Sequence, residues 1–157
     1  MNIELRNIAH NKGLSQETIA FAADVYVDGK KAGNAVNNGH GGMTMVHIDD
    51  AMTFKRVKEY VRSLDSVDLG EGLGTTPMTL ELFIDIQLEK QLNEKHAIAQ
   101  KKRWCKNEVV YRLKGDTPNT YRTLKFDNGT FSQRQREWMQ KTYGDQIEEI
   151  VNDTLAK

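Results

Sequence analysis

The chain has 157 residues, of which 38% are hydrophobic and 28% charged, and its formal net charge is zero. This length suits one domain, and the composition is that of a folded chain rather than a disordered one. We expect a single domain over residues 1–157, with sub-lobes at 1–65 and 77–157 as the alternative. The single cysteine, Cys105, excludes an internal disulfide and indicates a reducing compartment. Since neither a signal peptide nor a membrane-spanning apolar run occurs, we expect a cytoplasmic protein without membrane contact.

The zero net charge hides an uneven distribution along the chain. Residues 1–94 hold 9 basic and 14 acidic side chains, a net charge of −5. Residues 95–141 hold 12 basic and 4 acidic side chains, a net charge of +8, and residues 142–157 carry −3. A local excess of this size predicts a positive surface that attracts anions. The simpler alternative is a solvated helix face together with a strand edge guarded by lysine and arginine.

The first fifty residues have the alternating pattern of β-strands. Apolar residues occupy every second position from Ile19 to Val27, and the same alternation occurs at residues 3–5. Asp28-Gly29 follows at once and predicts a two-residue hairpin turn, with residues 30–36 as the return strand. Residues 37–48 add a glycine-rich turn and another short strand. Together these segments predict an antiparallel meander.

Two helices are predicted after the meander, separated by a glycine-rich connection. The first begins after the aspartates at 49–50 and ends near Asp65, with an apolar stripe at helical spacing. Residues 66–76 are typical of a flexible linker. The second helix is the longest, with Pro77 at or near its first helical position, and it reaches past His96.

A second hairpin and two short helices are predicted for the rest of the chain. Residues 107–113 and 120–126 have the pattern of its two strands. One helix runs over residues 132–143 and is stopped by Gly144, and another begins at Asp145 with a pattern like a capping box. The predicted fold class is therefore α+β: an N-terminal antiparallel β meander, then helices, a second β-hairpin and two short C-terminal helices.

The turn Gly39-His40-Gly41-Gly42 is the first candidate ligand site. Closely spaced glycines let backbone N–H groups approach a phosphate, although the order of residues matches neither a P-loop nor a Rossmann fingerprint. The simpler interpretation is a tight turn that needs positive φ, with His40 exposed at its tip. An enzyme that uses His40 as a general acid or base is a further hypothesis. No metal or cofactor motif occurs, so neither is predicted.

The second candidate site is the late basic hairpin. Cations interleaved with tyrosine are able to hold phosphates while an aromatic ring stacks a base. Trp104 and Trp138 are additional stacking surfaces. The alternative is that the aromatic rings are core and the cations cover the outside. The candidate binding residues of this hairpin are Arg112, Lys114, Tyr121, Arg122 and Lys125.

Several short motifs resemble those of small uncharacterised phage and prophage proteins. They are SQET at 15–18, YVDGKK at 26–31, GHGG at 39–42, YRLKGD at 111–116 and YRTLK at 121–125. The resemblance implies a phage-type protein that acts by binding something in its host, and it implies no activity, cofactor or catalytic residue.

We therefore expect a non-enzymatic protein whose basic surface binds a nucleotide or nucleic acid. The alternative is a protein–protein inhibitor or adaptor directed at a host defence factor, suggested by the β module with its exposed hairpins. The enzyme that uses His40 comes third. The sequence leaves open the oligomeric state and whether the two β regions join one sheet.

Overall fold

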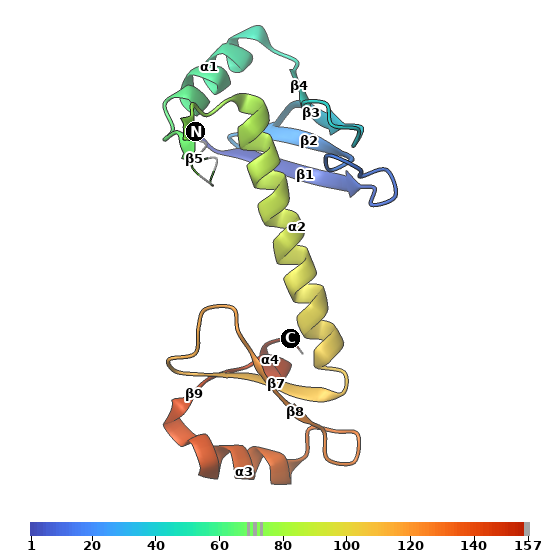
Figure 1. Ribbon diagram of the computed structural model, residues 1–157, viewed down its shortest axis with the longest axis vertical. Helices are drawn as coiled ribbons and strands as arrows, with labels where there is room; N and C mark the ends of the chain where they lie inside the picture. Colours follow the sequence, from blue (N-terminus) through green and yellow to red (C-terminus); the bar gives the residue numbers. More distant parts are fainter. Residues whose placement is uncertain (69, 71, 73, 156–157) are drawn as a thin grey trace. The chain divides into compact units, whose positions relative to one another are not determined.

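The computed structural model describes residues 1–68, 70, 72 and 74–155. It has an N-terminal antiparallel meander, helices and further strand pairs, which confirms the predicted α+β class (Figure 1). The chain divides into two compact units, Met1–Leu92 and Asn93–Lys157, called here the first and second units. The division falls within a helix, whereas the sub-lobes expected from the sequence meet at the glycine-rich stretch 66–76.

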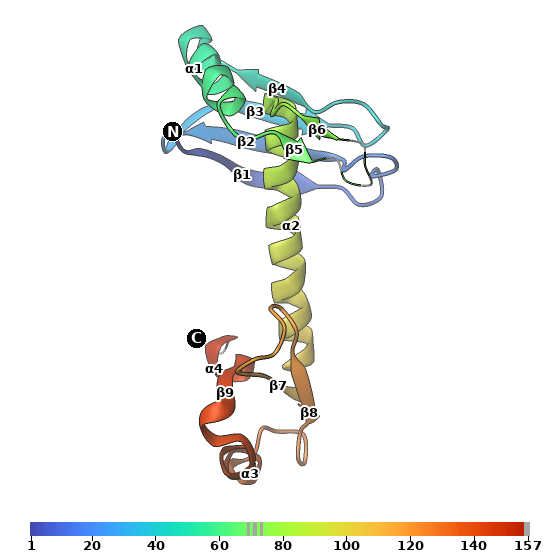
Figure 2. The same cartoon turned by 60° about the vertical axis from the view of Figure 1, so that its left-hand side comes forward.

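The first unit contains a four-stranded antiparallel sheet whose strands follow their order in the sequence (Figure 2). In the turn between the second and third strands, Asp28 and Gly29 have φ values of 49° and 80°, and Val27 pairs with Lys30. This is the two-residue hairpin that the sequence predicts. The strands are β1 (Ile3–His10), β2 (Phe21–Val27), β3 (Lys30–Asn37) and β4 (Met45–Ile48).

Two helices bury the apolar face of this sheet. They are α1 (Ala51–Arg62) and the first part of α2 (Leu80–Trp104). Alternate residues of the strands supply the facing side, because successive side chains of a strand point to opposite faces. α1 begins after Asp50, whose side chain accepts a hydrogen bond from the Thr53 backbone N–H at 2.7 Å. The shared core includes Leu5, Phe21, Val25, Val57, Val61, Ile84 and Leu88.

The predicted flexible linker contains a short pair of strands. β5 (Val67–Asp68) pairs antiparallel with β6 (Thr75–Thr76). The sequence shows no sign of this pair, because two-residue strands are too short to produce a periodic pattern. Part of the predicted linker, namely Leu69, Glu71 and Leu73, lies outside the described residues.

The long helix begins at Leu80 and not at Pro77, so the predicted helix start is wrong. Thr79 caps the helix: its Oγ1 accepts a hydrogen bond from the Leu82 backbone N–H at 3.2 Å. A threonine hydroxyl satisfies one of the free N–H groups at a helix start, which a proline ring does not do. The helix extends past His96 to Trp104, as predicted, and residues 93–100 are all exposed.

The second unit contains a separate three-stranded antiparallel sheet, so the two β regions do not share one sheet in the described part of the chain. β7 (Glu108–Leu113) lies between β8 (Arg122–Lys125) and β9 (Ile147–Ile150). α3 (Gln133–Tyr143) begins with a capping box made by Ser132 and Gln135. The core of this unit contains Val109, Tyr111, Leu113 and Met139, with Leu124 and Phe126 packed against them.

The prediction of a helix that begins at Asp145 is largely wrong, because the segment after Gly144 does not begin with an α-helix. It consists of a 3-10 turn, η1 (Gly144–Gln146), then β9 and a short helix, α4 (Val151–Leu155). Ile147 and Ile150 have spacing that suits a helix, but both pack against the core of the second unit. β9 also pairs with the free edge of β7, and such tertiary pairing overrides a local helix signal.

Candidate functional site

The glycine-rich turn at residues 39–42 lies in the first unit, between β3 and β4. The N–H groups of Gly39 and Gly41 donate to the side chains of Asn37 and Thr18 at 2.8 and 3.3 Å. The His40 N–H donates to the side-chain oxygen of residue 38 at 3.2 Å. A phosphate cradle needs N–H groups that point at the ligand. Because these three are already used, the geometry favours the structural turn over the anion site.

Asn37 joins this turn to the loop that precedes β2. Its side chain accepts a hydrogen bond from Thr18 Oγ1 at 2.9 Å and donates to the Gly42 carbonyl at 3.0 Å and to Thr44 Oγ1 at 3.2 Å. The Gly39 carbonyl accepts three backbone hydrogen bonds, at 3.0 to 3.4 Å, from residues 16, 17 and 18. The SQET and GHGG motifs therefore lie against each other.

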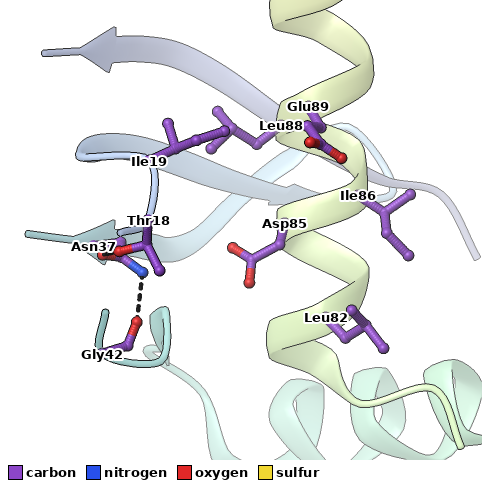
Figure 3. A pocket seen from close by; sticks show the side chains of 9 residues that line it. All are labelled: Thr18, Ile19, Asn37, Gly42, Leu82, Asp85, Ile86, Leu88 and Glu89. Carbon is purple, nitrogen blue, oxygen red and sulfur yellow. Dashed lines mark hydrogen bonds between the residues drawn. The ribbon is translucent and has the colours of Figure 1, made fainter. Parts of the chain in front are cut away.

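A pocket of about 250 Å³ opens between this turn and α2 (Figure 3). Asn37 lines one side, and Asp85 and Glu89 of α2 line the other. Burial raises the pKa of the Asp85 carboxyl, the hydrogen bond from Thr44 opposes this, and Glu81 and Glu89 raise the pKa further. Carboxylates at the wall of a pocket repel phosphate, so this pocket does not suit an anion.

His40 is exposed at the tip of the turn. No hydrogen bond or ion pair holds its imidazole among the residues that the structure describes. An acid–base catalyst is usually oriented by a partner group. The structure therefore adds no support to the hypothesis of catalysis by His40.

Both arginines of the predicted basic hairpin are held in ion pairs in the second unit. Arg112 on β7 makes hydrogen bonds of 3.0 and 2.5 Å with Glu148 of β9. Arg122 on β8 makes hydrogen bonds of 3.0 and 2.6 Å with Asp116. The Arg122 guanidinium and the Leu113 backbone N–H lower the pKa of Asp116 to about 2. A carboxylate thus occupies the guanidinium fork that a phosphate would use.

The side chains of the other predicted hairpin residues differ in whether a ligand is able to reach them. Lys101, near the end of α2, lies 4.2 Å from the ring centroid of Tyr121 and donates to its hydroxyl. This cation covers one face of the ring that the sequence assigns to base stacking. Lys114 and Lys125 are exposed, and neither forms an ion pair with another described residue. These two lysines therefore keep an available charge.

A pocket of about 400 Å³ lies between β8 and α3 of the second unit. It is lined by Lys125 of β8 and by Arg134 and Trp138 of α3. Arg134 and Trp138 are four residues apart and so share one face of the helix. Trp138 is 45% exposed, and its contact with Tyr143 is edge-on, with ring centroids 5.8 Å apart and planes at 86°. Arg134 is exposed and has no ion pair within the described ranges.

Gln135 fixes the two walls of this pocket to each other. Its Nε2 donates to the Lys125 carbonyl at 2.7 Å, and its Oε1 accepts from the Asp127 backbone N–H at 3.0 Å. The same Oε1 accepts from the Ser132 backbone N–H at 3.3 Å, at the start of α3. The pocket is therefore held by contacts between a side chain and the backbone of the opposite wall.

Arg134 and Gln135 are not among the site residues predicted from the sequence, and Trp138 enters there only as an extra stacking surface. The sequence signal for Arg134 and Trp138 is the helix predicted at 132–143, in which this cation and this tryptophan stand four residues apart.

Cys105 is not an activated thiol, because burial raises its pKa and Lys101 opposes this only in part.

No protein-family model, curated protein or solved structure matches this chain. The resemblance to phage and prophage proteins therefore stays a prediction. In the described part of the chain, no helix has the length and apolar character needed to cross a membrane. The same residues contain no group of three or more His, Cys, Asp or Glu side chains placed to hold a metal ion.

Proposed function

We propose that the second unit binds a nucleotide or nucleic acid, without chemical change, at the pocket between β8 and α3. The observation that carries this proposal is an exposed ring, Trp138, in one pocket with Lys125 and Arg134, two cations that form no ion pair with any described residue. Guanidinium and ammonium groups recognise phosphate, and an open aromatic ring stacks a base. No other described pocket combines these two properties with walls that lack a cluster of carboxylates.

The ligand class is the one expected from the sequence, but the proposed site differs. Residues 95–141 carry a net charge of +8, and Arg112, Arg122 and Arg136 of that stretch are paired with carboxylates. Among the described residues, the cations of that stretch without an ion pair are lysines together with Arg103 and Arg134. Such charges raise the rate at which an anionic ligand arrives, whereas the pocket determines where it is held.

Equilibrium binding of labelled oligonucleotides, measured by fluorescence anisotropy over a series of salt concentrations, tests the proposal. Affinity should fall as salt rises, because each phosphate contact releases counterions. Arg134→Ala should weaken binding about tenfold, the equivalent of ~1.4 kcal/mol for one charge-assisted contact. Lys125→Ala should act in the same way, and each variant should reduce the salt slope by about 0.7 for a single strand or about 0.9 for a duplex.

Lys114→Ala is the matched control. It removes an exposed lysine of the same unit that has no ion pair in the described part of the chain and does not line the pocket. Its affinity should change far less than that of Arg134→Ala. A greater loss for Lys114→Ala would move the site to the hairpin turn, and binding that is insensitive to both salt and Arg134→Ala would refute the proposal.

We also propose a phage or prophage origin and action in the cytoplasm of the host. The support is the resemblance of short motifs, together with a single cysteine that suits a reducing compartment. The genes that flank the coding sequence test the origin, and fractionation of producing cells tests the compartment. If no nucleotide or nucleic acid binds, capture of a stoichiometric protein partner from host lysate would favour an inhibitor or adaptor instead.

A further inference from the structure

We infer that the ligand is a single-stranded nucleic acid and that one of its bases stacks on Trp138, an inference that rests on the function proposed above. Among the described residues, the exposed large apolar side chains include one aromatic ring, that of Trp138. Tyr111 is only 6% exposed, and a lysine covers Tyr121. The Arg136 guanidinium lies 3.9 Å from the ring centroid of Phe131. Trp138 is therefore the ring that a base reaches.

Stacking on a protein ring requires a base with a free face. In a double helix each base lies between its neighbours, so the duplex presents phosphates and groove edges to a protein. In a single strand a base is free to leave the stack and lie on an aromatic side chain. The pocket volume of about 400 Å³ is in the range of small-molecule sites and suits one nucleotide unit. Ring and pocket together favour single strands over duplex.

The cations of the pocket determine how many phosphates are bound. Lys125 lies on one wall, and Arg134 lies one helical turn from Trp138 on the other. Because the pocket has two cations, at most two phosphate contacts are available. Asp127 also lines the pocket, and its carboxylate repels phosphate. For a single strand, two contacts predict a slope of about −1.4 in a plot of log K against log salt concentration.

Trp138 is also the reporter for the test. The chain has two tryptophans, so Trp104→Phe leaves Trp138 as the only source of tryptophan emission. The full chain is titrated with an oligothymidylate of about ten nucleotides, a duplex of the same length and thymidine monophosphate. We expect the oligothymidylate to quench Trp138 and to bind more tightly than either other probe.

Variants of the ring itself test the stacking, with binding followed by anisotropy. Trp138→Ala should weaken binding of the oligothymidylate about 5- to 150-fold, the equivalent of ~1–3 kcal/mol for one stacked base. Trp138→Phe keeps an aromatic face and should recover most of the affinity. This second variant also serves if the far-UV circular dichroism of Trp138→Ala shows a disturbed fold.

The outcomes separate this inference from the proposed function. Equal affinity for duplex and single strand, with no effect of Trp138→Phe or Trp138→Ala, would overturn the single-strand inference. A loss of that binding in Arg134→Ala would still support the proposed function. Thymidine monophosphate that binds as tightly as the oligomer would overturn the inference in favour of a nucleotide pocket. Failure of all three probes to bind would overturn both.

Discussion

Replacing Asn37 by alanine should destabilise the first unit by about 3 kcal/mol. The side chain of Asn37 is 7% exposed and makes four hydrogen bonds around the turn between β3 and β4. It accepts from Thr18 and Gly39 and donates to Gly42 and Thr44. Alanine removes the four bonds together and leaves their partner groups in place.

The magnitude depends on which partner groups reach water. Gly39 is buried, so its N–H would lose its acceptor at a cost of about 1–3 kcal/mol. Thr44 is 2% exposed, but its hydroxyl would still donate to Asp85. Thr18 and Gly42 are partly or fully exposed, so each loses only the net value of a hydrogen bond, about 0.5–1.5 kcal/mol.

Urea unfolding followed by far-UV circular dichroism measures the effect. Asn34→Ala is the control, because Asn34 lies on the same strand, is exposed and makes no side-chain hydrogen bond with another described residue. Its effect should stay within about 0.5 kcal/mol. Hydrogen exchange of the Gly39 amide should also become faster in Asn37→Ala. Equal shifts in the two variants, with unchanged exchange at Gly39, would refute the role of Asn37 in holding the turn.

Two further predictions concern a close backbone approach and an ion pair. Gly33→Ala should destabilise the first unit by at least about 1–3 kcal/mol, because a Cβ there would lie 1.9 Å from the His47 carbonyl oxygen on β4. Gly42→Ala, where a Cβ meets nothing within 4 Å, should have little effect, and equal urea midpoints for the two variants would contradict the close approach. The pKa of Asp116 is about 2 in the folded protein against an ordinary value of 3.8, so the stability that its ion pair contributes is present above about pH 4 and is lost as the pH falls towards about 2. Asp116→Asn should therefore flatten this part of the acid unfolding curve. The curve is measured by tryptophan fluorescence, since both tryptophans lie in the second unit. A curve for the variant as steep as that of the wild type would contradict this role of the ion pair.

The candidate site was only partly predictable from the sequence. The +8 stretch and the aromatic residues within it contain the pocket at which we propose that an anion binds. The sequence does not show which cations are free to bind an anion. Arg112 and Glu148, for example, lie 36 positions apart in the chain and meet only when β7 pairs with β9. The pairing of Arg122 with Asp116 likewise depends on how the turn after β7 folds back. That Arg134 has no carboxylate partner among the described residues is likewise visible only in the three-dimensional structure.

The sequence by itself determined the local structure of this protein. Alternation of apolar residues from Ile19 to Val27, followed by Asp28-Gly29, is enough to specify two strands and their turn, because side-chain direction and turn geometry depend on neighbouring residues alone. The capping box at Ser132 determines the start of α3 for the same reason. Only the tertiary structure decided that Ile147–Ile150 is a strand and that the chain divides within α2. Pairing with the edge of β7 and burial against a distant core involve residues far apart in the chain, and no local pattern encodes them.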